Sequence, residues 1–346
     1  MRIWFTLLFF ILLQFYINSR LVAQKQSCDY YDAGIMFYNV ENLFDIYNNS
    51  DKNDDEFTPT GARGWSYGRF KEKITNISRV ILTAGGFSPP VIVGLCEVEN
   101  EYVLNKLIFE TGLDNLNYKP VHYNSGDFRG VDVALLYRSD HFKLFSSYPV
   151  QIELPQGRRA TRDILYAKGV LYNRDTLHLL VNHWPSRFGG VAATQEYREI
   201  AAETLYSATD SIFSLNQEAF VIVMGDFNEP LNSSIFEAFA AIGRTECDSS
   251  MIVMTSCHID SNRGTIKYRY RWDLFDQIMV SRNMLSDSLS IFVEKPEMEI
   301  VDLPFLLEPD EAFGGKRPYR SYRGYQYIGG YSDHLPVWLN LKVKRE

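Results

Sequence analysis

The stretch Phe220-Val-Ile-Val-Met-Gly-Asp-Phe-Asn228 indicates both the kind of fold and the place where polar groups collect. Its first five residues are a short apolar run, as expected of a strand buried on both faces, and Asp226 and Asn228 follow at its end. Similar short apolar runs begin at Gly34, Val91, Val131, Leu177, Phe275 and Val337. The sequence therefore predicts a sheet-rich core with polar side chains at the ends of the strands.

Two helices are predicted between these strands. One covers about residues 67–83 and ends at Gly85-Gly86, and the other covers about residues 194–212. The apolar residues that recur on one face of the first helix are Phe70, Ile74, Ile77 and Ile81. Because strands outnumber helices and the helices fall between them, we expect an α/β fold in which two sheets pack together with helices outside. Residues 45–66 and 308–332 are predicted to be long loops.

The composition is that of a globular protein with an acidic balance. The chain has 346 residues, 46% of them hydrophobic, and a formal net charge of −8. No linker rich in proline, glycine or serine divides it, so residues 30–346 are expected to form one domain. An acidic chain is not expected to bind nucleic acid non-specifically, so any polyanion must be held by a local basic site or by a metal.

The N-terminus has the pattern of a secretory signal peptide. Arg2 precedes an apolar run from Ile3 to Ile17, and the small residue Ala23 precedes a polar one. Residues 1–23 are therefore predicted to be a signal peptide of an exported protein, periplasmic or secreted, with an uncleaved anchor helix as the alternative. Of the four cysteines, Cys28, Cys96, Cys247 and Cys257, none forms a CxxC pair, which argues against a zinc site of that type. Cys247 and Cys257 are predicted either to pair or to stay free thiols, and Cys96 to be a buried small residue.

Polar residues stand at the ends of several predicted strands. The segments are Asn39-Val-Glu41-Asn42, Glu97, Asn182-His183, Asp226 with Asn228, Asp276, and Ser332-Asp333-His334. If these ends converge, Glu97 and Asp333 offer the oxygen ligands that a hard cation such as Mg²⁺ prefers. Asp226 then polarises a water while Asn228 fixes its geometry. His183 and His334 donate to a phosphoryl group, and Asp276 orients an imidazole. Taken singly, each residue also fits an ordinary turn, cap or core position; Glu99 and Glu101 are predicted to be surface charges.

In this order, the segments resemble the endonuclease/exonuclease/phosphatase superfamily from about Ile35 to Val343. The resemblance implies a four-layer α/β sandwich of two packed, mostly antiparallel sheets flanked by helices. It also implies that Glu97 is the principal metal ligand, that Glu41 and Asp333 are further ligands, and that Asn39 lies near the metal and the substrate phosphate. Asp226 with Asn228 resembles the pair that activates water, and His334 with Asp276 the histidine–aspartate pair beside the phosphate. His183 matches the histidine of DNase-like and sphingomyelinase-like members.

The substrate follows less directly from the sequence. Arg162 and Arg187 are predicted to hold the phosphate, because arginine suits bidentate phosphate contacts, and Arg129 either faces the cleft or is structural. The segment 316–327 interleaves cations with tyrosines, which suits nucleic acid but also fits an ordinary surface loop. We therefore expect a monomeric exported nuclease that acts on DNA or RNA with Mg²⁺, or with Mn²⁺ or Ca²⁺. The alternatives are an inositol phosphate phosphatase, a sphingomyelinase-like phosphodiesterase, and a binding module without catalysis.

Overall fold

The computed structural model describes residues 29–86, 88–230, 233–236, 251–253, 263–295 and 297–345. The predicted signal peptide and three of the cysteines, Cys28, Cys247 and Cys257, lie outside these residues. Among the residues described, no helix is long and apolar enough to cross a membrane.

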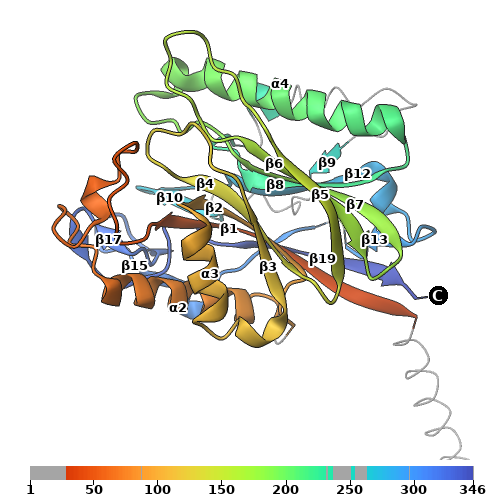
Figure 1. Cartoon of the computed structure of the whole chain (residues 1–346), viewed down its shortest axis with the longest axis horizontal. Coiled ribbons are helices and arrows are strands. Elements are labelled where there is room, and N and C mark those ends of the chain that lie inside the picture. Colours follow the sequence, from red (N-terminus) through yellow and green to blue (C-terminus); the bar gives the residue numbers. More distant parts are fainter. Residues whose placement is uncertain are drawn as a thin grey trace, which may run out of the picture.

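The described residues form two large sheets that pack face to face (Figure 1). The first sheet has the strand order β13-β19-β1-β2-β4-β3, with β14 also paired to β19. Its strands are β1 (Tyr30–Leu43), β2 (Ile92–Val98), β3 (Tyr118–His122), β4 (Asp132–Arg138), β13 (Ile291–Val293), β14 (Glu299–Ile300) and β19 (Val337–Lys344). The second sheet has the order β5-β6-β7-β8-β12-β9. Its strands are β5 (Phe142–Val150), β6 (Ile164–Leu171), β7 (Asp175–His183), β8 (Phe220–Asp226), β9 (Met251–Val253) and β12 (Asp276–Ser281).

Each large sheet has one parallel pair at its centre, and the other described pairs are antiparallel. The parallel pairs are β1 with β2 and β7 with β8. The carboxyl ends of parallel neighbours lie at the same edge of a sheet, so Asn39 is in register with Cys96, and His183 with Asp226. The antiparallel strand β12 places Asp276 opposite Asp226. This topology brings the predicted polar strand ends to one edge of the molecule.

The helices cover the outer faces of the two sheets. The first sheet carries α2 (Tyr67–Thr83) and α3 (Glu101–Phe109), and the second carries α4 (Val191–Leu215), as Figure 1 shows on opposite sides of the stack. One apolar cluster fills the space between the sheets, a second lies under α2 and α3, and a third lies under α4. The expected four-layer α/β sandwich is therefore confirmed.

The predicted helix ends match the observed ones best where a capping residue and the packing of the helix favour the same bounds. Helix α2 has the predicted bounds, since Ser66 caps its first turn by accepting from the Arg69 amide and its apolar face packs on β1. Helix α4 starts earlier than predicted, at Val191, whose carbonyl accepts a hydrogen bond from Arg198 (3.0 Å). Helix α3 was not predicted. Its apolar residues occupy only two turns behind the Asn100 cap, which is too short for a clear period.

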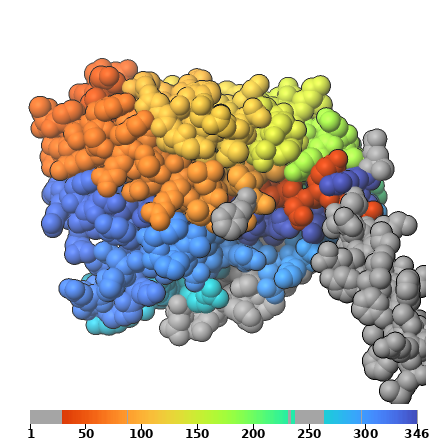
Figure 2. All heavy atoms as spheres, turned by 90° about the horizontal axis from the view of Figure 1, so that it is seen from below, coloured from red at the N-terminus to blue at the C-terminus, as the bar shows by residue number. Residues whose placement is uncertain are grey.

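The late segment 308–332 is not the plain loop that the sequence predicts. It carries the hairpins β15 (Leu307–Pro309) with β16 (Lys316–Pro318) and β17 (Tyr322–Arg323) with β18 (Gln326–Tyr327). Helix α2 fixes it from beneath, because the buried Lys73 ammonium donates to Ser321 Oγ (2.7 Å) and to the Tyr331 carbonyl. In Figure 2 the orange surface of this early part of the chain borders the blue surface of the late part. The contact positions the segment that leads to Asp333 and His334.

Candidate active site

The predicted site residues meet at the edge where both sheets present the ends of their central strands. Strand β1 supplies Asn39 and Glu41, β2 supplies Glu97, and β7 supplies His183. Asp226 and Asp276 come from β8 and β12, and Asp333 and His334 precede β19. Gly225 makes the close pairing of β7 with β8 possible, since an added Cβ would lie 2.5 Å from the Asn182 carbonyl oxygen. The structure thus assembles one site from segments spread over 300 residues.

Asp226 lies at the centre of this site, in contact with residues from several strands. Its Oδ2 accepts a hydrogen bond from Asn39 Nδ2 (3.0 Å), and its Oδ1 accepts one from the Asn228 amide (3.0 Å). The Nε2 atoms of His183 and His334 each lie 3.8 Å from Oδ2. Burial raises the pKa of Asp226 to about 6, with a further contribution from Asp276, although His334 and the two hydrogen bonds act in the opposite direction. This carboxylate can therefore take up a proton near neutral pH.

The two histidines carry different charges although both are buried. His334 Nδ1 lies 2.7 Å from Asp276 Oδ2, and the carboxylates of Asp276 and Asp226 raise its pKa well above the ordinary value despite the opposing effect of burial. Burial lowers the pKa of His183 well below the ordinary value, and the cations Arg162 and Arg129 lower it further. At neutral pH the site therefore holds one imidazolium, at His334, and one neutral imidazole, at His183.

A second group of carboxylates lies on the more open side of the site. Arg320 bridges Glu41 Oε1 (2.6 Å) and Asp333 Oδ2 (3.1 Å), and the Ser321 amide donates to Glu41 Oε2 (3.0 Å). Glu97 Oε2 accepts from the Asn42 amide (2.9 Å). Burial raises the pKa of Glu41 to about 7, and the charge of Asp333 adds to this effect while Arg320 opposes it.

The strand ends and loops that carry these site residues also have strained backbone conformations. Glu41, Asn42, Glu97 and Asn228 all have a positive φ, between 50° and 63°. Such conformations cost non-glycine residues roughly 1–3 kcal/mol each and collect at functional sites. The strain lets the chain turn sharply at the strand ends and direct these side chains into the site.

The donor set of Glu41, Glu97 and Asp333 fits a hard divalent cation. All of its donors are oxygens, and a dication would favour the charged form of Glu41, whose pKa is raised mainly by burial and further by Asp333. Among the described residues, the compact groups of three donor atoms within 4.8 Å are Asp226–Asp276–His334 and Cys96–His183–Asp226. The three carboxylates therefore stand further apart, as suits an ion that keeps several waters and a substrate oxygen in its shell.

The arginines lie differently from the sequence-based expectation. Arg162 is buried, and its guanidinium donates to Asp127 (3.2 Å) and to the Trp184 carbonyl. Arg187 donates to the Asn228 carbonyl (2.8 Å) and to Glu229 (2.9 Å), so it supports the loop of Asn228. The arginines beside the carboxylates are Arg129, 3.8 Å from Glu97 Oε1, and Arg320. Both stood in segments that the sequence analysis noted, but their partners come from distant parts of the chain.

Glu99 corrects a further expectation. It was predicted to be a surface charge, but it is 9% exposed and its Oε2 accepts from the Asp45 amide (2.6 Å). Burial raises its pKa to about 8. The sequence shows only its position after an apolar run, which does not reveal the loop that covers it.

A hairpin beside the site was missed by the sequence analysis. Strands β10 (Ile266–Tyr268) and β11 (Arg271–Asp273) form this hairpin, with Tyr268 at the end of β10 and Tyr270 in the turn. The two tyrosines are 65% and 74% exposed. Ile266 forms a β-bridge with His334, and the Asp276 amide donates to Thr265 Oγ1 (3.3 Å). The pattern Lys267-Tyr-Arg-Tyr-Arg-Trp272 interleaves cations with aromatics, the same signal that was recognised only at 316–327. Cations of both segments form ion pairs: Arg271 pairs with Asp273 (3.0 Å) and Lys267 with Asp310 (2.8 Å) in the hairpin. In the late segment, Arg317 and Arg323 pair with Glu308, and Arg320 pairs with Glu41.

Comparisons with known proteins agree with this site. The sequence pattern of the Endonuclease/Exonuclease/phosphatase family matches residues 34–343. No curated protein sequence matches the chain. The human nocturnin catalytic domain is a similar solved structure (TM-score 0.55, 14% identity, 91% of this chain and 97% of that chain).

Two proteins from Bacteroides thetaiotaomicron are also similar in structure. One is an endonuclease/exonuclease/phosphatase family protein (TM-score 0.55, 17% identity, 91% of this chain and 99% of that chain). The other is a mannosyl-6-phosphatase (TM-score 0.54, 16% identity, 89% and 99%). At these identities the likeness to solved structures shows the fold, while the family pattern covers nearly all of the chain. The chain therefore belongs to the endonuclease/exonuclease/phosphatase family and is a metal-dependent phosphoester hydrolase.

Proposed function

We propose that this hydrolase is a nuclease that cleaves phosphodiester bonds of DNA or RNA. The observation that carries the proposal is the exposed β10–β11 hairpin beside His334. Tyr268 and Tyr270 offer faces on which bases stack, and Arg269 offers charge for the backbone. Arg271 pairs with Asp273 but is 66% exposed, so a phosphate can still reach its guanidinium. A hollow of about 380 Å³ lies along the hairpin and reaches Leu335, next to His334. Its walls include Tyr270, Trp272 and Lys316, which suit a base or sugar with its phosphate.

In the proposed mechanism, water attacks phosphorus and Asp226 takes the water proton. Asn39 and the Asn228 amide hold the Asp226 carboxylate in place through their hydrogen bonds. The His334 imidazolium stabilises the charge that develops on the phosphoryl oxygens. Asp276 orients the His334 ring and stabilises its positive charge. The bond from phosphorus to the leaving oxygen breaks opposite the attacking water. His183, as a neutral imidazole, positions a phosphate oxygen or the water.

Glu97 and Asp333, with Glu41, would hold the divalent cation, which we propose to be Mg²⁺. When bound, it neutralises the phosphate and the charge that develops during attack. Arg320 holds Glu41 and Asp333 close together by pairing with both carboxylates.

A phosphatase acting on a small phosphate ester is the second candidate. The three arginines of the late segment, Arg317, Arg320 and Arg323, are engaged in ion pairs, and the 380 Å³ hollow would also suit one sugar phosphate. A similar fold belongs to the mannosyl-6-phosphatase, which makes sugar phosphates a sensible arm of the test.

We also propose that the protein is exported. The support is the pattern of Arg2, the apolar run Ile3–Ile17 and Ala23. Edman sequencing of protein purified from cells would reveal the mature N-terminus. A start at Gln24 supports cleavage after Ala23, whereas retention of Met1 or Arg2 contradicts it.

The substrate proposal is tested by a cleavage panel with Mg²⁺, Mn²⁺ or EDTA. The substrates are plasmid DNA, single-stranded DNA, RNA, sphingomyelin, inositol polyphosphates and mannose 6-phosphate. We expect metal-dependent cleavage of nucleic acid that is lost in Asp226→Ala and His334→Ala. Asp210→Ala, which removes an exposed carboxylate from α4, is the matched control and should remain active.

Each outcome of the panel has a definite meaning. Activity on phosphomonoesters alone would keep the mechanism and replace the nuclease by the phosphatase. Activity on sphingomyelin alone would replace it by a phospholipid diesterase. Nucleic-acid cleavage that survives in both site variants would show that a contaminant, and not this site, is responsible.

A further inference from the structure

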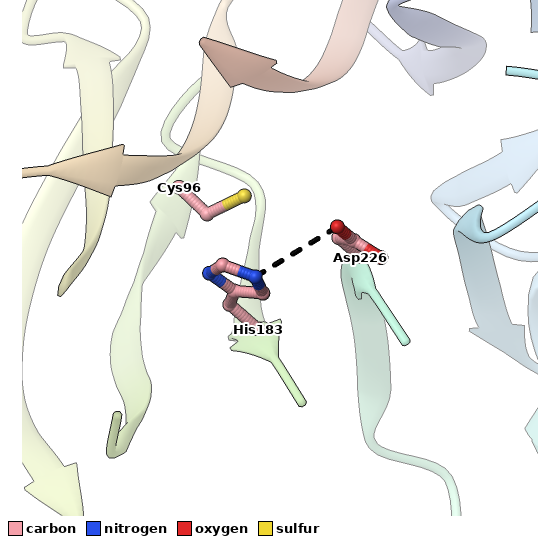
Figure 3. Close-up of side chains that lie close together, drawn as sticks. All are labelled: Cys96, His183 and Asp226. Carbon is pink, nitrogen blue, oxygen red and sulfur yellow. Dashed lines mark ion pairs between the residues drawn. The ribbon is translucent and has the colours of Figure 1, made fainter. Parts of the chain in front are cut away.

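Cys96 brings a sulfur atom to the floor of the site. It is fully buried at the end of β2, in register with Asn39 and next to Glu97. Its Sγ, one ring nitrogen of His183 and one carboxylate oxygen of Asp226 all lie within 4.8 Å of one another. Figure 3 shows the three side chains turned toward a common point from β2, β7 and β8. The group therefore draws on both sheets.

The second observation that points to a ligand is the imidazole of His183, whose Nε2 faces Asp226 but is too far from it for a hydrogen bond. His183 is 3% exposed, and its Nδ1 makes no hydrogen bond within the described part of the chain. Its Nε2 lies 3.8 Å from Asp226 Oδ2, which is longer than a hydrogen bond. Buried polar atoms rarely lack a partner, and those that do call for a ligand, ion or water.

The donor set differs in kind from that of the three carboxylates. Sulfur, imidazole nitrogen and carboxylate oxygen are the ligands that zinc prefers, whereas magnesium takes oxygen alone. Three protein ligands with a fourth position left to water or substrate are typical of an open zinc site. Zinc bond lengths place ligand atoms roughly 3.5 Å apart around one ion. Side-chain rotations that move the three donor atoms by about 1 Å would bring them to this separation.

We propose that Cys96, His183 and Asp226 form a zinc site, and that zinc bound there inhibits the hydrolase. On binding, the Cys96 sulfur–hydrogen bond gives its proton to solvent and a sulfur–zinc bond forms, with no change in oxidation state. Asp226 then directs an oxygen to the ion, so this carboxylate no longer accepts the proton of the attacking water. His183 is removed from the substrate in the same way. The inhibition rests on the proposed role of Asp226, but the metal site does not.

Binding is tested without any substrate, with Co²⁺ as a spectroscopic substitute for zinc. Purified, reduced protein is titrated with Co²⁺, and the sulfur-to-cobalt charge-transfer absorption is followed. We expect one equivalent to bind with this absorption, and Zn²⁺ to displace it. The absorption should be lost in Cys96→Ala and kept in the variant Cys28→Ala/Cys247→Ala/Cys257→Ala, which retains only Cys96. The reverse pattern would assign the sulfur to another cysteine and overturn the site.

Because Cys96 is fully buried, a conservative second variant guards against misfolding. Cys96→Ser keeps the volume and lacks the sulfur, so it should also lose the charge-transfer absorption. His183→Ala should weaken cobalt binding at least tenfold, as expected when one of three ligands is removed. Unchanged affinity in that variant would exclude His183 as a ligand and overturn the proposal.

Inhibition is tested on Mg²⁺-supported hydrolysis of bis(p-nitrophenyl) phosphate. Each variant is compared with its own zinc-free rate, so that a change in basal rate does not matter. We expect the zinc concentration for half-inhibition to rise at least tenfold in Cys96→Ser. Equal zinc sensitivity with and without Cys96 would overturn the inhibitory role. If no substrate is hydrolysed, the catalytic proposal fails, while the cobalt titration still decides the metal site.

Discussion

Burial disfavours the charged form of both Asp226 and His334, but the neighbouring carboxylates favour the charge of His334 alone. The pKa of Asp226 is raised from 3.8 to about 6, mainly by burial. The pKa of His334 is raised well above its ordinary value by Asp276 and Asp226, against the effect of burial. Near neutral pH the pair is therefore a carboxylate that accepts a proton beside an imidazolium that binds an anion.

This charge division predicts a pH profile. Since Asp226 must be unprotonated to accept the water proton, kcat/KM should fall as pH drops through about 6 and reach a plateau above it. An alkaline limb follows where His334 loses its proton. The measurement is the rate of hydrolysis of a chromogenic phosphodiester, whose phosphate does not titrate in this range. A rate that stays flat down to pH 4.5 would remove Asp226 from the role of base.

Asp276→Asn tests the support of His334. The amide keeps the shape of the side chain but removes the charge that favours the imidazolium, so we expect kcat to fall by about 10²–10⁴-fold. The alkaline limb should also move to lower pH, which a merely structural change would not cause. Asp32→Asn, at an exposed pair with Lys342 near the start of β1, is the control and should leave both readouts unchanged. A loss below threefold with an unmoved limb would contradict the assignment.

At the residue scale, the predicted carboxylates, amides and histidines lie together at one edge of the sheets, whereas the predicted arginines pair with other residues. Glu97, Asp226 and His334 stand at strand ends, and the strand order alone brings such residues together. The long side chains of Arg162 and Arg187 can reach many partners, and the partners they found, Asp127 and Glu229, lie outside the predicted segments. Their contacts depend on tertiary structure that no local pattern shows.

At the scale of elements, one buried ion pair ties helix α4 to the loop that carries Asn228. Arg198 is fully buried and pairs with Glu229, which also accepts from Arg187 (2.9 Å). Arg198→Met should lower the free energy of unfolding by about 3–5 kcal/mol, because it leaves a buried carboxylate with fewer partners. Urea unfolding followed by circular dichroism measures this change.

The double variant Arg198→Met/Glu229→Leu separates the ion pair from the general loss of packing. It removes both charges, so it should recover much of the stability that the single variant loses. The activity of the double variant should be lower than that of the unchanged protein. Arg187 supports the Asn228 loop, and without Glu229 it loses the carboxylate that fixes its guanidinium. If the double variant is less stable than the sum of the two single changes, the pair is not the source of the effect.

The β10–β11 hairpin separates the two substrate candidates. Tyr268→Ala and Tyr270→Ala should each raise KM for a single-stranded oligonucleotide roughly tenfold, since base stacking on an aromatic contributes about 1–3 kcal/mol. The kinetic constants for a small chromogenic ester should not change. Tyr325→Ala, at a residue 66% exposed on the late segment, serves as the matched control. Equal KM values for the oligonucleotide in all variants would remove the hairpin from substrate binding and favour the phosphatase.

Elements with a clear apolar pattern were predicted from the sequence, whereas the strands β5 (9 residues) and β6 (8 residues) and the short elements were missed. Helix α2 has both a polar cap and an apolar face with a helical period, so local signals agree with the fold. Helix α3 and the hairpins of residues 307–327 are stabilised mainly by what they touch, such as Lys73 on Ser321. Elements of two or three residues contain no period, so their presence follows from the tertiary structure.

At the scale of the whole molecule, the site lies where the two sheets touch through Asn39 and Asp226. Each sheet contributes the ends of one parallel pair, and neither sheet alone holds a complete set of groups. Loops that leave the same edge, such as the β10–β11 hairpin, can therefore alter substrate choice while the central strands stay fixed. This division explains why the sequence indicates the chemistry more clearly than the substrate.

The overall charge predicts how salt affects nucleic-acid binding. The protein carries a net charge of −8, so only cations near the site can hold a polyanion. The candidates are Arg269 and Arg271 on the hairpin and Arg129 beside Glu97. Two or three phosphate contacts on single-stranded DNA give a slope of about −2 in a plot of log affinity against log salt concentration.

Fluorescence anisotropy with Asp226→Ala measures binding without cleavage. Adding Arg269→Ala should make the slope shallower by about 0.7, because one phosphate contact is lost. A slope steeper than about −5 would require a larger basic surface than this acidic molecule offers around its site, and would contradict the assignment of these few arginines as the phosphate contacts.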